Sequence, residues 1–588
     1  MSTVTLILCL VITVLLFIYY LSVRNYNYWK RKNVPHPKPL PLLGNFGEYI
    51  LMRKYRGEVI QKICQQFPRE PYIGAYYGTE PTLIIQDPEI IKKFEYWKKK
   101  SVPHLKPLPL LGNYSDYILM RKYLGEVSQE LCRQFPNEPY FGAYYGTEPA
   151  LVILNPEIIK LVFVKDFYYF NSREIAKYTH LEVTTQNLLF TYGDKWKVLR
   201  QNLTPLFSSS KMKNMFHLIA NCGYALEDML DEESKDVIEA KSLMIRYTMG
   251  CIGSCAFGID CKITSKAKEN PFVMMGHKIF ATSTFMGFKR VFRTIWPKIF
   301  YSLGMKFYPT AIDTFFKNLL ISVFEKRDYK PTSRQDFVDL VLGLRDSKYI
   351  GGDSLNPKSI GNKKIEMEVT DDLLVSQCIL FFGAGFETSA STLAFALYEL
   401  AKDQRAQRRA QEEVDEFLHR HNNKLVYGCV TELPFVEACL KETMRLYPVL
   451  PIITREVMED YTFPDGLQVN RGVRVQLPVY HIHHDPNNFL DPNTFRPERF
   501  YQECMSEVKP YTYFPFGDGP RQCIGLRFSK MQTAVALITI LKKYTVELAE
   551  GTPTKLEFYP SAFLTNTKNA LNLKFTARDE WQQRVYSR

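Results

Sequence analysis

Apolar and polar positions follow the helical period over most of this chain. Downstream of Lys160, apolar side chains recur every three or four residues in long runs, as in amphipathic helices. A loop rich in Gly, Ser, Asn and Lys begins at Ser347, and a long apolar helix is expected from about Val369. Past Pro448 the pattern indicates short strands and loops, and one strong helix follows Gly525. The chain is therefore predicted to be mainly α with small β-sheets, an α+β fold.

The N-terminal segment is apolar enough to cross a membrane. Val4–Val23 is a nearly unbroken apolar run of about 20 residues, the length that spans a bilayer as a helix. Positive charges follow it at Arg24 and at positions 30–32, which by the positive-inside rule places the rest of the chain in the cytosol. The run lacks the cleavage site and the short apolar core of a signal peptide. We therefore expect an uncleaved membrane anchor over residues 1–23.

One long segment of the sequence occurs twice. Tyr28–Lys92 and Tyr96–Lys160 are identical at roughly three quarters of their positions, so Tyr28–Glu95 is duplicated as Tyr96–Phe163. Each copy indicates a Pro-rich hinge, a short helix, a pair of strands and another helix. In the second copy the strands are expected near residues 140–146 and 149–155. We call these segments the first copy and the second copy.

Composition and charge limit the class of protein. The chain is 46% hydrophobic and 23% charged, with a formal net charge of +13 over 588 residues. The basic residues are scattered, so nucleic acid is not an expected partner. The twelve cysteines are dispersed, which is typical of free thiols in a reducing compartment. We expect an anchor over 1–23, a basic Pro-rich hinge with the extra copy over 24–95, and one large catalytic domain over 96–588.

The strongest chemical signal is "FPFGDGPRQCIGLRF", from Phe514 to Phe528. Its glycines let the backbone fold closely against a flat partner. The helix expected after Gly525 places its positive dipole end near Cys523, which favours a thiolate. Such a thiolate is a suitable axial ligand for haem iron. A buried cysteine in a glycine-rich turn is the alternative.

This motif matches the haem-binding signature of the cytochrome P450 family, F-x-x-G-x-R-x-C-x-G, without departure. The order and spacing of the other motifs resemble those of insect microsomal members that metabolise xenobiotics. The resemblance covers the anchor and the chain from about Tyr96 onward. It implies the cytochrome P450 fold with an N-terminal transmembrane helix. It also implies a haem b whose iron is held by Cys523, with Phe516, Gly517 and Gly525 beside it.

The motif "AGFET" places polar groups in the long apolar helix. Gly383 and Gly385 weaken the helix, so we expect a distorted turn that opens a notch for a small ligand. The hydroxyl of Thr388 and the carboxyl of Glu387 can relay protons there. Alternatively, Thr388 bonds back to the carbonyl of residue i−4. The resemblance assigns both residues to proton delivery during dioxygen activation.

The segment "KETMRLYP" suggests a structural ion network. Glu442 and Arg445 are three residues apart and share one helix face. With Arg499 of "FRPERF" they resemble the family's buried Glu–Arg–Arg network, which supports the cysteine loop. A surface ion pair is the alternative.

The resemblance also implies partners for the haem propionates. Trp196 and Arg200 in "WKVLR" match a W-x-x-x-R helix of the family, and Arg455 and Arg521 complete the set. Arginine suits carboxylates because its donors form a planar fork. The histidine-rich "HIHHD", from His481, is expected on a strand; we do not assign a metal to it, since no other His/Cys cluster supplies ligands.

The function implied by the resemblance is a membrane-anchored haem-thiolate monooxygenase that inserts one oxygen atom from O₂ into small lipophilic substrates. Electrons come from NADPH through a flavoprotein reductase, and cytochrome b5 is a further candidate partner. The expected location is the endoplasmic reticulum membrane, with the catalytic domain in the cytosol. Two alternatives stay open: a haem-thiolate isomerase or lyase, and a haem-binding protein whose catalysis the duplication impairs.

The duplication is the one departure from the family pattern. The small sheet of the fold has room for one strand pair, and the second copy runs directly on towards Trp196. We therefore expect the second copy to occupy that place and the first copy to be an extra module, loosely packed or competing for it. An exon duplication, an error in the assembled gene and a selected spacer remain alternative origins.

Overall fold

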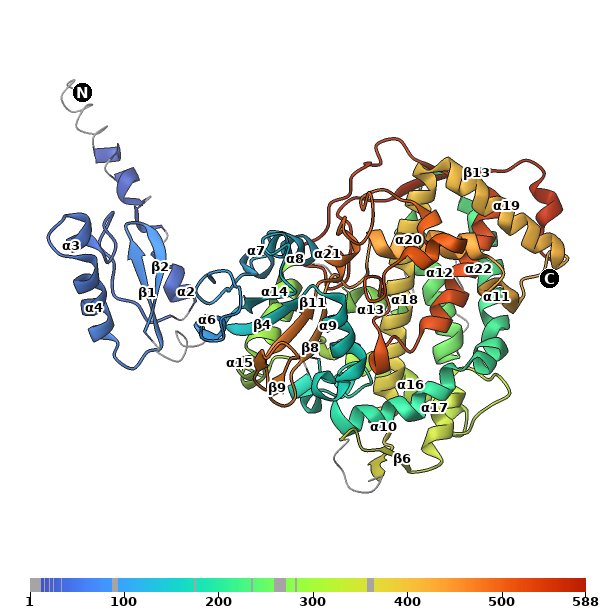
Figure 1. Ribbon diagram of the computed structural model, residues 1–588, viewed down its shortest axis with the longest axis horizontal. Helices are drawn as coiled ribbons and strands as arrows, with labels where there is room; N and C mark the ends of the chain where they lie inside the picture. The colour runs from blue at the N-terminus through green and yellow to red at the C-terminus, as the bar shows by residue number, and fades with distance from the viewer. Residues whose placement is uncertain are drawn as a thin grey trace. The chain divides into compact units, whose positions relative to one another are not determined.

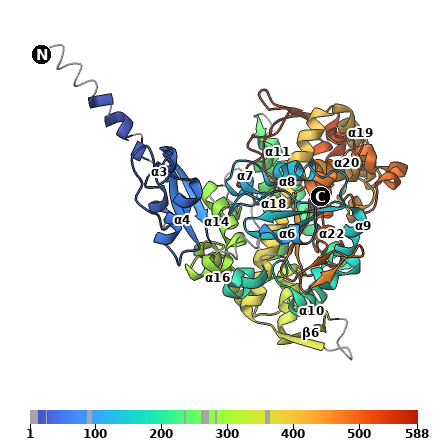
Figure 2. The same cartoon turned by 60° about the vertical axis from the view of Figure 1, so that its left-hand side comes forward.

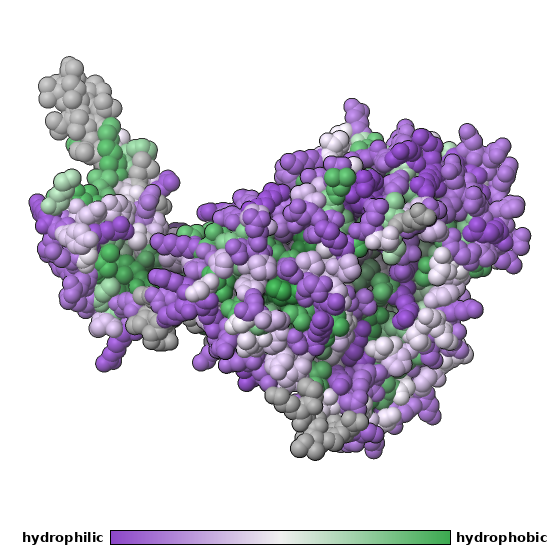
Figure 3. Space-filling model, in the orientation of Figure 1, coloured by the Kyte–Doolittle hydropathy of each residue, from purple (hydrophilic) through white to green (hydrophobic). Residues whose placement is uncertain are grey.

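The computed structural model (Figure 1) describes residues 12–14, 16–20, 22–24, 26–32, 34–86, 94–173, 176–233, 236–258, 271–280, 283–356 and 364–587. The chain forms two compact units: unit 1 comprises Met1–Val102 with Pro107–Gly112, and unit 2 comprises Pro103–Lys106 with Asn113–Arg588. The predicted anchor lies largely outside the described residues. Its described helical part exposes apolar side chains such as Leu16 and Phe17 (Figure 3).

Unit 1 is built on the β1–β2 hairpin of the first copy. Its elements are α2 (Tyr28–Arg31), α3 (Gly47–Ile50), α4 (Arg56–Gln66), β1 (Tyr72–Tyr77), β2 (Glu80–Ile85) and α6 (Tyr96–Lys99). Side chains of α4 and of both strands form a buried core that includes Val59, Ile63, Ile73 and Ile84. The first copy thus has a buried core of its own over residues 34–86, and its place as an extra module stays a prediction. The sheet has two strands, so the outer edge of β2 has no partner within it.

Unit 2 is mainly helical. Its α-helices are α7 (Ser115–Ile118), α8 (Leu124–Cys132), α9 (Pro156–Lys160), α10 (Gly193–Leu203), α11 (Ser209–Glu233), α12 (Ala240–Phe257), α13 (Pro271–Ile279), α14 (Thr284–Ile295), α15 (Pro297–Ser302), α16 (Thr310–Lys326), α17 (Phe337–Arg345), α18 (Asp371–Lys402), α19 (Gln404–Arg420), α20 (Pro434–Leu446), α21 (Val479–His483) and α22 (Leu526–Leu541). Shorter helical turns are η1 (Leu161–Lys165), η2 (Phe167–Phe170), η3 (Ala176–Leu181), η4 (Val183–Thr185), η5 (Thr204–Phe207), η7 (Tyr427–Val430), η8 (Pro497–Phe500), η9 (Gln502–Glu507), η10 (Gly519–Arg521) and η11 (Trp581–Arg584).

The strands of unit 2 form small sheets beside this helical body. They are β3 (Tyr140–Tyr145), β4 (Glu148–Ile153), β5 (Ile238–Glu239), β6 (Tyr349–Asp353), β7 (Lys364–Glu368), β8 (Ile453–Glu456), β9 (Tyr461–Thr462), β10 (Gln468–Val469), β11 (Arg474–Leu477), β12 (Tyr544–Leu548) and β13 (Asn572–Ala577). The sheets are β3-β4-β11-β8, β12-β13-β5, β9-β10 and β6-β7. The predicted mixture of helices and small sheets is confirmed.

The second copy contributes its hairpin to the four-stranded sheet. β4 pairs in parallel with β11, with Leu151 opposite Val475, and β11 pairs antiparallel with β8, with Val475 opposite Arg455. The second copy therefore lies where the sequence predicted it, beside strands that follow α20. This pairing also fixes the position of Arg455 at the edge of the sheet.

Helix α18 passes through the interior of unit 2, as Figures 1 and 2 show. It packs against α12, α16, α20 and α22, and its apolar residues belong to the main core. Among the described helices α18 is the one apolar and long enough to cross a membrane, but 78% of its apolar window is buried inside the protein. Its hydrophobicity is therefore explained by its place in the core.

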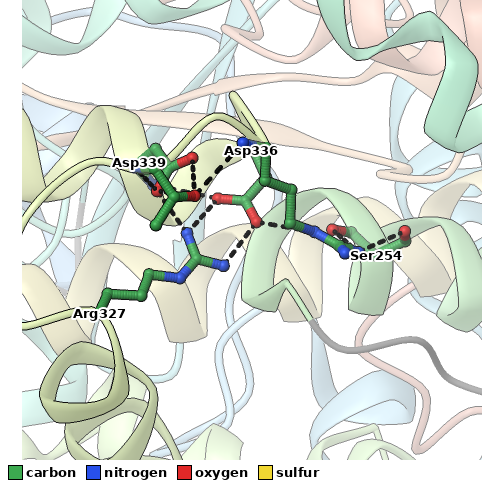
Figure 4. Close-up of polar contacts among 6 residues, drawn as sticks. Ser254, Arg327, Asp336 and Asp339 are labelled. Atoms are coloured by element: carbon green, nitrogen blue, oxygen red, sulfur yellow. Dashed lines mark hydrogen bonds and ion pairs between the residues drawn. The ribbon is translucent and has the colours of Figure 1, made fainter.

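An ion cluster joins the ends of α12, α16 and α17 (Figure 4). Arg327 makes a bidentate pair with Asp336, at 2.7 and 2.8 Å, and a 2.6 Å contact with Asp339. Asp336 caps α17 by accepting a hydrogen bond from the amide of Asp339. Gly258 has φ +63°, and a Cβ there would lie 1.9 Å from an Arg327 nitrogen. The cluster therefore needs glycine at the end of α12, the helix that packs against α18.

Three local predictions are wrong. The loop expected after Ser347 contains β6, which pairs with β7. The strand expected at "HIHHD" is α21, a short helix. No distorted turn occurs at Gly383 and Gly385, because α18 is continuous; instead, a Cβ on Gly385 would lie 2.3 Å from Ile252, so this glycine lets α12 approach α18 closely.

Candidate functional site

A cavity of about 360 Å³ lies inside unit 2, between α18 and the loop before α22. Its walls come from segments that are far apart in the sequence, including η4, α10, α12, α14, α18, β8 and the loop that carries Cys523. Most of the lining side chains are apolar, such as Phe280, Ile379 and Leu564. Among the described residues that line it, none is an aspartate or a glutamate. The described lining therefore offers no carboxylate to neutralise the arginines that also line the cavity.

The cysteine loop holds Cys523 at one end of this cavity. The amide of Cys523 donates a 2.9 Å hydrogen bond to the carbonyl of Phe516. Gly517 has φ +67°, the left-handed conformation that glycine adopts at little cost. Gly525 is the N-cap of α22, and a Cβ there would lie 3.9 Å from the cysteine sulfur. Phe516, Gly517, Cys523 and Gly525 all line the cavity, as the sequence predicted for a flat ligand.

The cysteine loop needs glycine at position 519 because the loop backbone lies very close to Phe163 there. Its φ is +67°, and a Cβ would lie 2.0 Å from the carbonyl oxygen of Phe163. The side chain of Asp518 accepts a hydrogen bond from the Gly519 amide and starts the short η10 turn. η10 ends at Arg521, so the turn aims this arginine and Cys523 into the same cavity.

The protonation of Cys523 is set by opposing influences. Its side chain is open to the cavity, yet it is enclosed by protein, and this burial raises the pKa of the thiol. The amide of Gly525 and the guanidinium groups of Arg200 and Arg173 lower the pKa. The helix start predicted to favour the thiolate does lower the pKa through the Gly525 amide, but desolvation by burial is the largest influence and raises it. An added positive ion at the sulfur favours the thiolate.

Four arginines surround the same end of the cavity. Arg200 on α10 donates to the carbonyl of Gln522 at 2.8 Å, and Arg455 on β8 donates to the carbonyl of Thr454 at 2.9 Å. Arg521 donates to the carbonyls of Leu189 and Thr191. The fourth, Arg173, also donates to the carbonyl of Leu189, at 3.2 Å. All four line the cavity, and three of them were predicted.

These guanidinium groups are close enough to destabilise one another's charge. Burial lowers the pKa of Arg455 to about 9 and that of Arg173 to about 10. Burial also lowers the pKa of Arg521, and its three neighbours lower it further. Arg455 and Arg521 each have a buried Nε atom without a hydrogen-bond partner. Clustered cations with unused donors fit a ligand that carries carboxylates, so these residues fit the two propionates of a haem.

Trp196 supports this cluster from α10. Its ring is 3% exposed, and the Arg521 guanidinium lies 4.7 Å from the ring centroid. Trp196 also lines the cavity, as predicted. Sequence reasoning missed Arg173, because it lies in an irregular segment with no motif that distinguishes it from a surface arginine.

Thr388 and Glu387 occupy different places although they are adjacent. Thr388 lines the cavity, and its hydroxyl donates a 2.6 Å hydrogen bond to the carbonyl of Ala384, the backbone alternative noted above. Glu387 is absent from the described lining; its carboxylate is buried and pairs with Lys241 of α12 at 2.7 Å. The structure thus brings Thr388 to the site and directs Glu387 to a helix–helix contact.

The Glu–Arg–Arg network is buried behind the cysteine loop. Both carboxylate oxygens of Glu442 accept hydrogen bonds from Arg445 at 2.8 Å, and one accepts from Arg499 at 3.2 Å. Glu442 and Arg445 are fully buried, so the alternative of a surface pair does not apply. None of the three lines the cavity, in agreement with a supporting role.

His483 connects this network to the cysteine loop. Arg445 donates to the carbonyl of His483 at 2.8 Å, while Nε2 of His483 accepts a 3.2 Å hydrogen bond from the amide of Phe514. Phe514 begins the loop that leads to Cys523. Sequence reasoning considered a metal site at this histidine and did not assign one. Its contact with Phe514 could not be found from the sequence, because the two segments meet only in the fold.

Comparisons with known proteins agree with this site. The family model described as "Cytochrome P450" matches residues 102–573. The chain is 32% identical to "Cytochrome P450 6B2" of Helicoverpa armigera over 497 residues, covering 83% of this chain and 95% of that protein. It is 34% identical to "Cytochrome P450 6k1" of Blattella germanica over 489 residues, covering 82% and 93%. With "Cytochrome P450 6B1" of Papilio polyxenes it shares 32% identity over 490 residues, covering 83% and 96%.

Proposed function

Since the chain belongs to the cytochrome P450 family and is a haem b monooxygenase of the insect type, we propose that it oxygenates small lipophilic molecules at the endoplasmic reticulum membrane. An N-terminal anchor over residues 1–23 would hold it there, with its catalytic domain in the cytosol. Electrons from NADPH reach it through a flavoprotein reductase, and cytochrome b5 is a second candidate donor.

One observation carries the assignment of the site: Cys523 and four arginines lie at the same end of an otherwise largely apolar cavity. The thiolate of Cys523 would hold the haem iron. Arg173, Arg200, Arg455 and Arg521 would bind the propionates through their charge, and Arg455 and Arg521 also through the Nε donors that lack protein partners. When bound, the haem supplies the activation of O₂.

Thr388 holds a proton at the wall of the cavity. Its Oγ1 donates to the Ala384 carbonyl, and this bond fixes the hydroxyl on the cavity face of α18. Rotation of the hydroxyl releases the proton to an acceptor in the cavity, which is a general-acid role. Glu387 is assigned here to the contact between α12 and α18, since its partner is Lys241. A relay through Glu387 would first have to break this pair.

Apolar walls exclude water and receive the substrate. Phe280, Ile379, Phe563 and Leu564 line the cavity from four segments of the chain. Burial of apolar surface here contributes about 25 cal/mol per Å² to the binding of a lipophilic molecule. The supporting network of Glu442, Arg445 and Arg499 keeps the opposite side of the cysteine loop in place.

For the first copy we propose the role of an additional module between anchor and enzyme. The family match begins at residue 102, inside the second copy, and the second copy supplies β3 and β4 to the sheet of unit 2. Both observations support a catalytic domain that begins within the second copy, close to the predicted boundary at residue 96. The core of the first copy indicates that it folds without taking part in the site.

A reconstituted system tests the proposal. The full-length chain in vesicles with an NADPH-dependent flavoprotein reductase should give the red-shifted Soret band of a reduced, carbon monoxide-bound haem thiolate. It should also consume NADPH and O₂ and form an oxygenated product. Cys523→Ser should remove the shifted band. Product formation without NADPH would instead support an isomerase or lyase, and a shifted band without turnover would support a haem-binding protein.

A further inference from the structure

Lys241, at the start of α12, contacts two separate elements of unit 2. Its Nζ lies 2.7 Å from a carboxylate oxygen of Glu387 on α18 and donates a 2.9 Å hydrogen bond to the side-chain oxygen of Asn566. An ammonium group has three donors, so it can hold both acceptors at once. The side chains of Lys241 and Glu387 are 14% and 8% exposed, so little water competes for these contacts. A charged donor makes the stronger kind of hydrogen bond, and Lys241 therefore links α18 to the segment of Asn566.

Asn566 closes a loop, residues 559–566, that we call the wall loop. The amide of Tyr559 donates a 2.9 Å hydrogen bond to the carbonyl of Asn566, so the two ends of the loop lie together. Between them, Phe563 and Leu564 line the cavity. The ammonium contact is thus made at the closed end of the wall loop, and a shift there would move both apolar side chains.

The backbone of Lys241 is attached on several sides. The carboxylate of Glu239 caps α12 by accepting hydrogen bonds from the amides of Lys241 and Ser242, at 3.1 and 2.6 Å. The preceding strand β5 pairs with β13, and the amide of Ala240 donates to the carbonyl of Leu571 at 2.8 Å. Helix α12 then packs along α18. Lys241 therefore extends from a fixed junction between a sheet and two helices.

We propose that Lys241 is a positioning residue that sets the length of the apolar chain that the cavity accepts. It holds the wall loop in a fixed place relative to α18, so the space that the two elements enclose is fixed as well. The amide of Thr565 also donates to the carbonyl of Val449 at 2.9 Å. The wall loop therefore stays attached when the contact with Lys241 is removed, but its apolar side chains can then move outwards. This role rests on the proposed function and adds substrate length to it as the property selected.

The test measures how ligand affinity depends on chain length in the full-length haem protein. The probes are 1-alkylimidazoles from 1-butylimidazole to 1-dodecylimidazole, whose free ring nitrogen binds the ferric iron and whose chain extends into the cavity. In the wild type, affinity should rise about fourfold with each methylene, reach an optimum and fall about tenfold for longer chains. Asn566→Ala and Lys241→Met should lose this fall, because the wall loop yields to the longer chain. Asn566→Asp, which keeps an acceptor for the ammonium, should retain the optimum.

A second measurement and a matched control separate this role from a merely structural one. Hydrogen exchange of peptides that cover the wall loop should be faster in Asn566→Ala and Lys241→Met than in the wild type. Lys542→Met removes another buried Lys–Glu pair, with Glu227; this lysine also donates to the carbonyl of Arg584 at 3.1 Å and is outside the described lining. The control should lower the Tm and keep the optimum.

Two further variants complete the design. Asn566→Ala leaves the pair of Lys241 and Glu387 intact, so it tests the loop contact even if Lys241→Met fails to fold. Glu387→Gln keeps the contact with Asn566 and should keep the optimum. A wild type without an optimum, an unchanged optimum in Asn566→Ala, or its loss in Lys542→Met would each overturn the proposal. Failure of the proposed function is recognised separately, by the missing shifted band of the reduced carbon monoxide complex.

Discussion

The amide of Phe514 donates a 3.2 Å hydrogen bond to Nε2 of His483, and this contact ties the cysteine loop to the buried ion network. His483 accepts here, so it is neutral with its proton on Nδ1. The loop that carries Cys523 is thus positioned by a residue that is not among the described lining of the cavity.

Replacing His483 by Ala should loosen the cysteine loop. The Phe514 amide would lose its buried acceptor, which costs about 1–3 kcal/mol of folding free energy. We expect a lower haem content and partial loss of the shifted band in the reduced carbon monoxide spectrum. His483→Gln, which can present an acceptor near Nε2, should recover part of that band, and His217→Ala, at an exposed position of α11, should leave it intact. A normal spectrum for His483→Ala would contradict this role.

Stability should fall as the solution is acidified below pH 6.5. Burial lowers the pKa of His484 to about 4, so the folded protein keeps this side chain neutral where the unfolded chain, with a pKa of 6.5, takes up a proton. The unfolded state binds more protons between these values, so the free energy of unfolding decreases as pH falls, by on the order of 3 kcal/mol in total.

Thermal unfolding of the haem protein between pH 7 and pH 4.5 measures this effect. His484→Phe removes the titrating group and keeps an aromatic ring against Tyr480, whose centroid is 4.3 Å away. Its Tm should depend less on pH than that of the wild type. An unchanged pH slope would show that other groups dominate, His483 among them, since burial lowers its pKa too.

Gly519→Ala should disrupt the cysteine loop far more than its backbone angle explains. Gly304→Ala is a matched control: Gly304 has φ +69° and no atom within 4 Å of where an added Cβ would lie, whereas a Cβ on Gly519 would lie 2.0 Å from the Phe163 carbonyl oxygen. The control should cost about 1 kcal/mol through the left-handed conformation alone. Haem content and Tm should both fall further in Gly519→Ala; equal effects would exclude the clash.

Substitutions of Thr388 and Glu387 should have different effects on product formation. Thr388→Ala removes the hydroxyl from the cavity wall, so product formation should fall by about 10²-fold while ligand binding and the carbon monoxide spectrum persist. Glu387→Gln leaves Lys241 without its charge partner and should lower the unfolding free energy by about 3–5 kcal/mol. Its ratio of product to NADPH should stay near that of the wild type. A matching loss of product in both variants would assign Glu387 to the proton path.

Deleting residues 28–95 should leave an active enzyme. The chain would keep the second copy, in which the hydroxyl of Tyr114 donates to Gln476 of β11. Deleting residues 96–163 is the matched alternative, because the first copy has Phe46 in place of Tyr114 and Ile60 in place of the buried Ser128. We expect this second deletion to lower haem content and Tm. Equal behaviour of the two deletions would show that the copies are interchangeable.

The sequence pattern predicted two kinds of element correctly: strands that pair with the next strand along the chain, and long helices with a clear apolar pattern. The β3–β4 hairpin and helices α18 and α22 are of this kind. The β6–β7 hairpin was missed, because its Gly-rich strand, Tyr349–Asp353, has no alternating apolar pattern and depends on pairing with residues 364–368. The strand predicted at "HIHHD" is wrong because Val479–His483 forms the short helix α21, which packs against α8.

Site residues could be predicted from the sequence where they belong to a recognisable motif. Arg521 and Cys523 lie within one signature, and Arg200 lies one helical turn from Trp196. Arg173 and Arg290 have no such signature; Arg173 lies in the irregular segment after η2 and Arg290 lies on α14, and the fold brings both to the cavity. Thr388 and Glu387 show the remaining limit: adjacent residues on a helix point to different neighbours, and sequence alone does not say which one faces the ligand.

Within the described residues β2 pairs with β1 alone, and this has a consequence for how the protein folds during synthesis. The ribosome completes both nearly identical hairpins well before it makes β11, so a nascent chain holds two candidates when that strand emerges. In the folded protein β4 of the second hairpin pairs with β11, and Tyr114 of the same copy donates to Gln476 of that strand. We therefore expect β2 and β4 to compete for pairing with β11 during synthesis. Slower translation of the segment before β11 should change the yield of active enzyme.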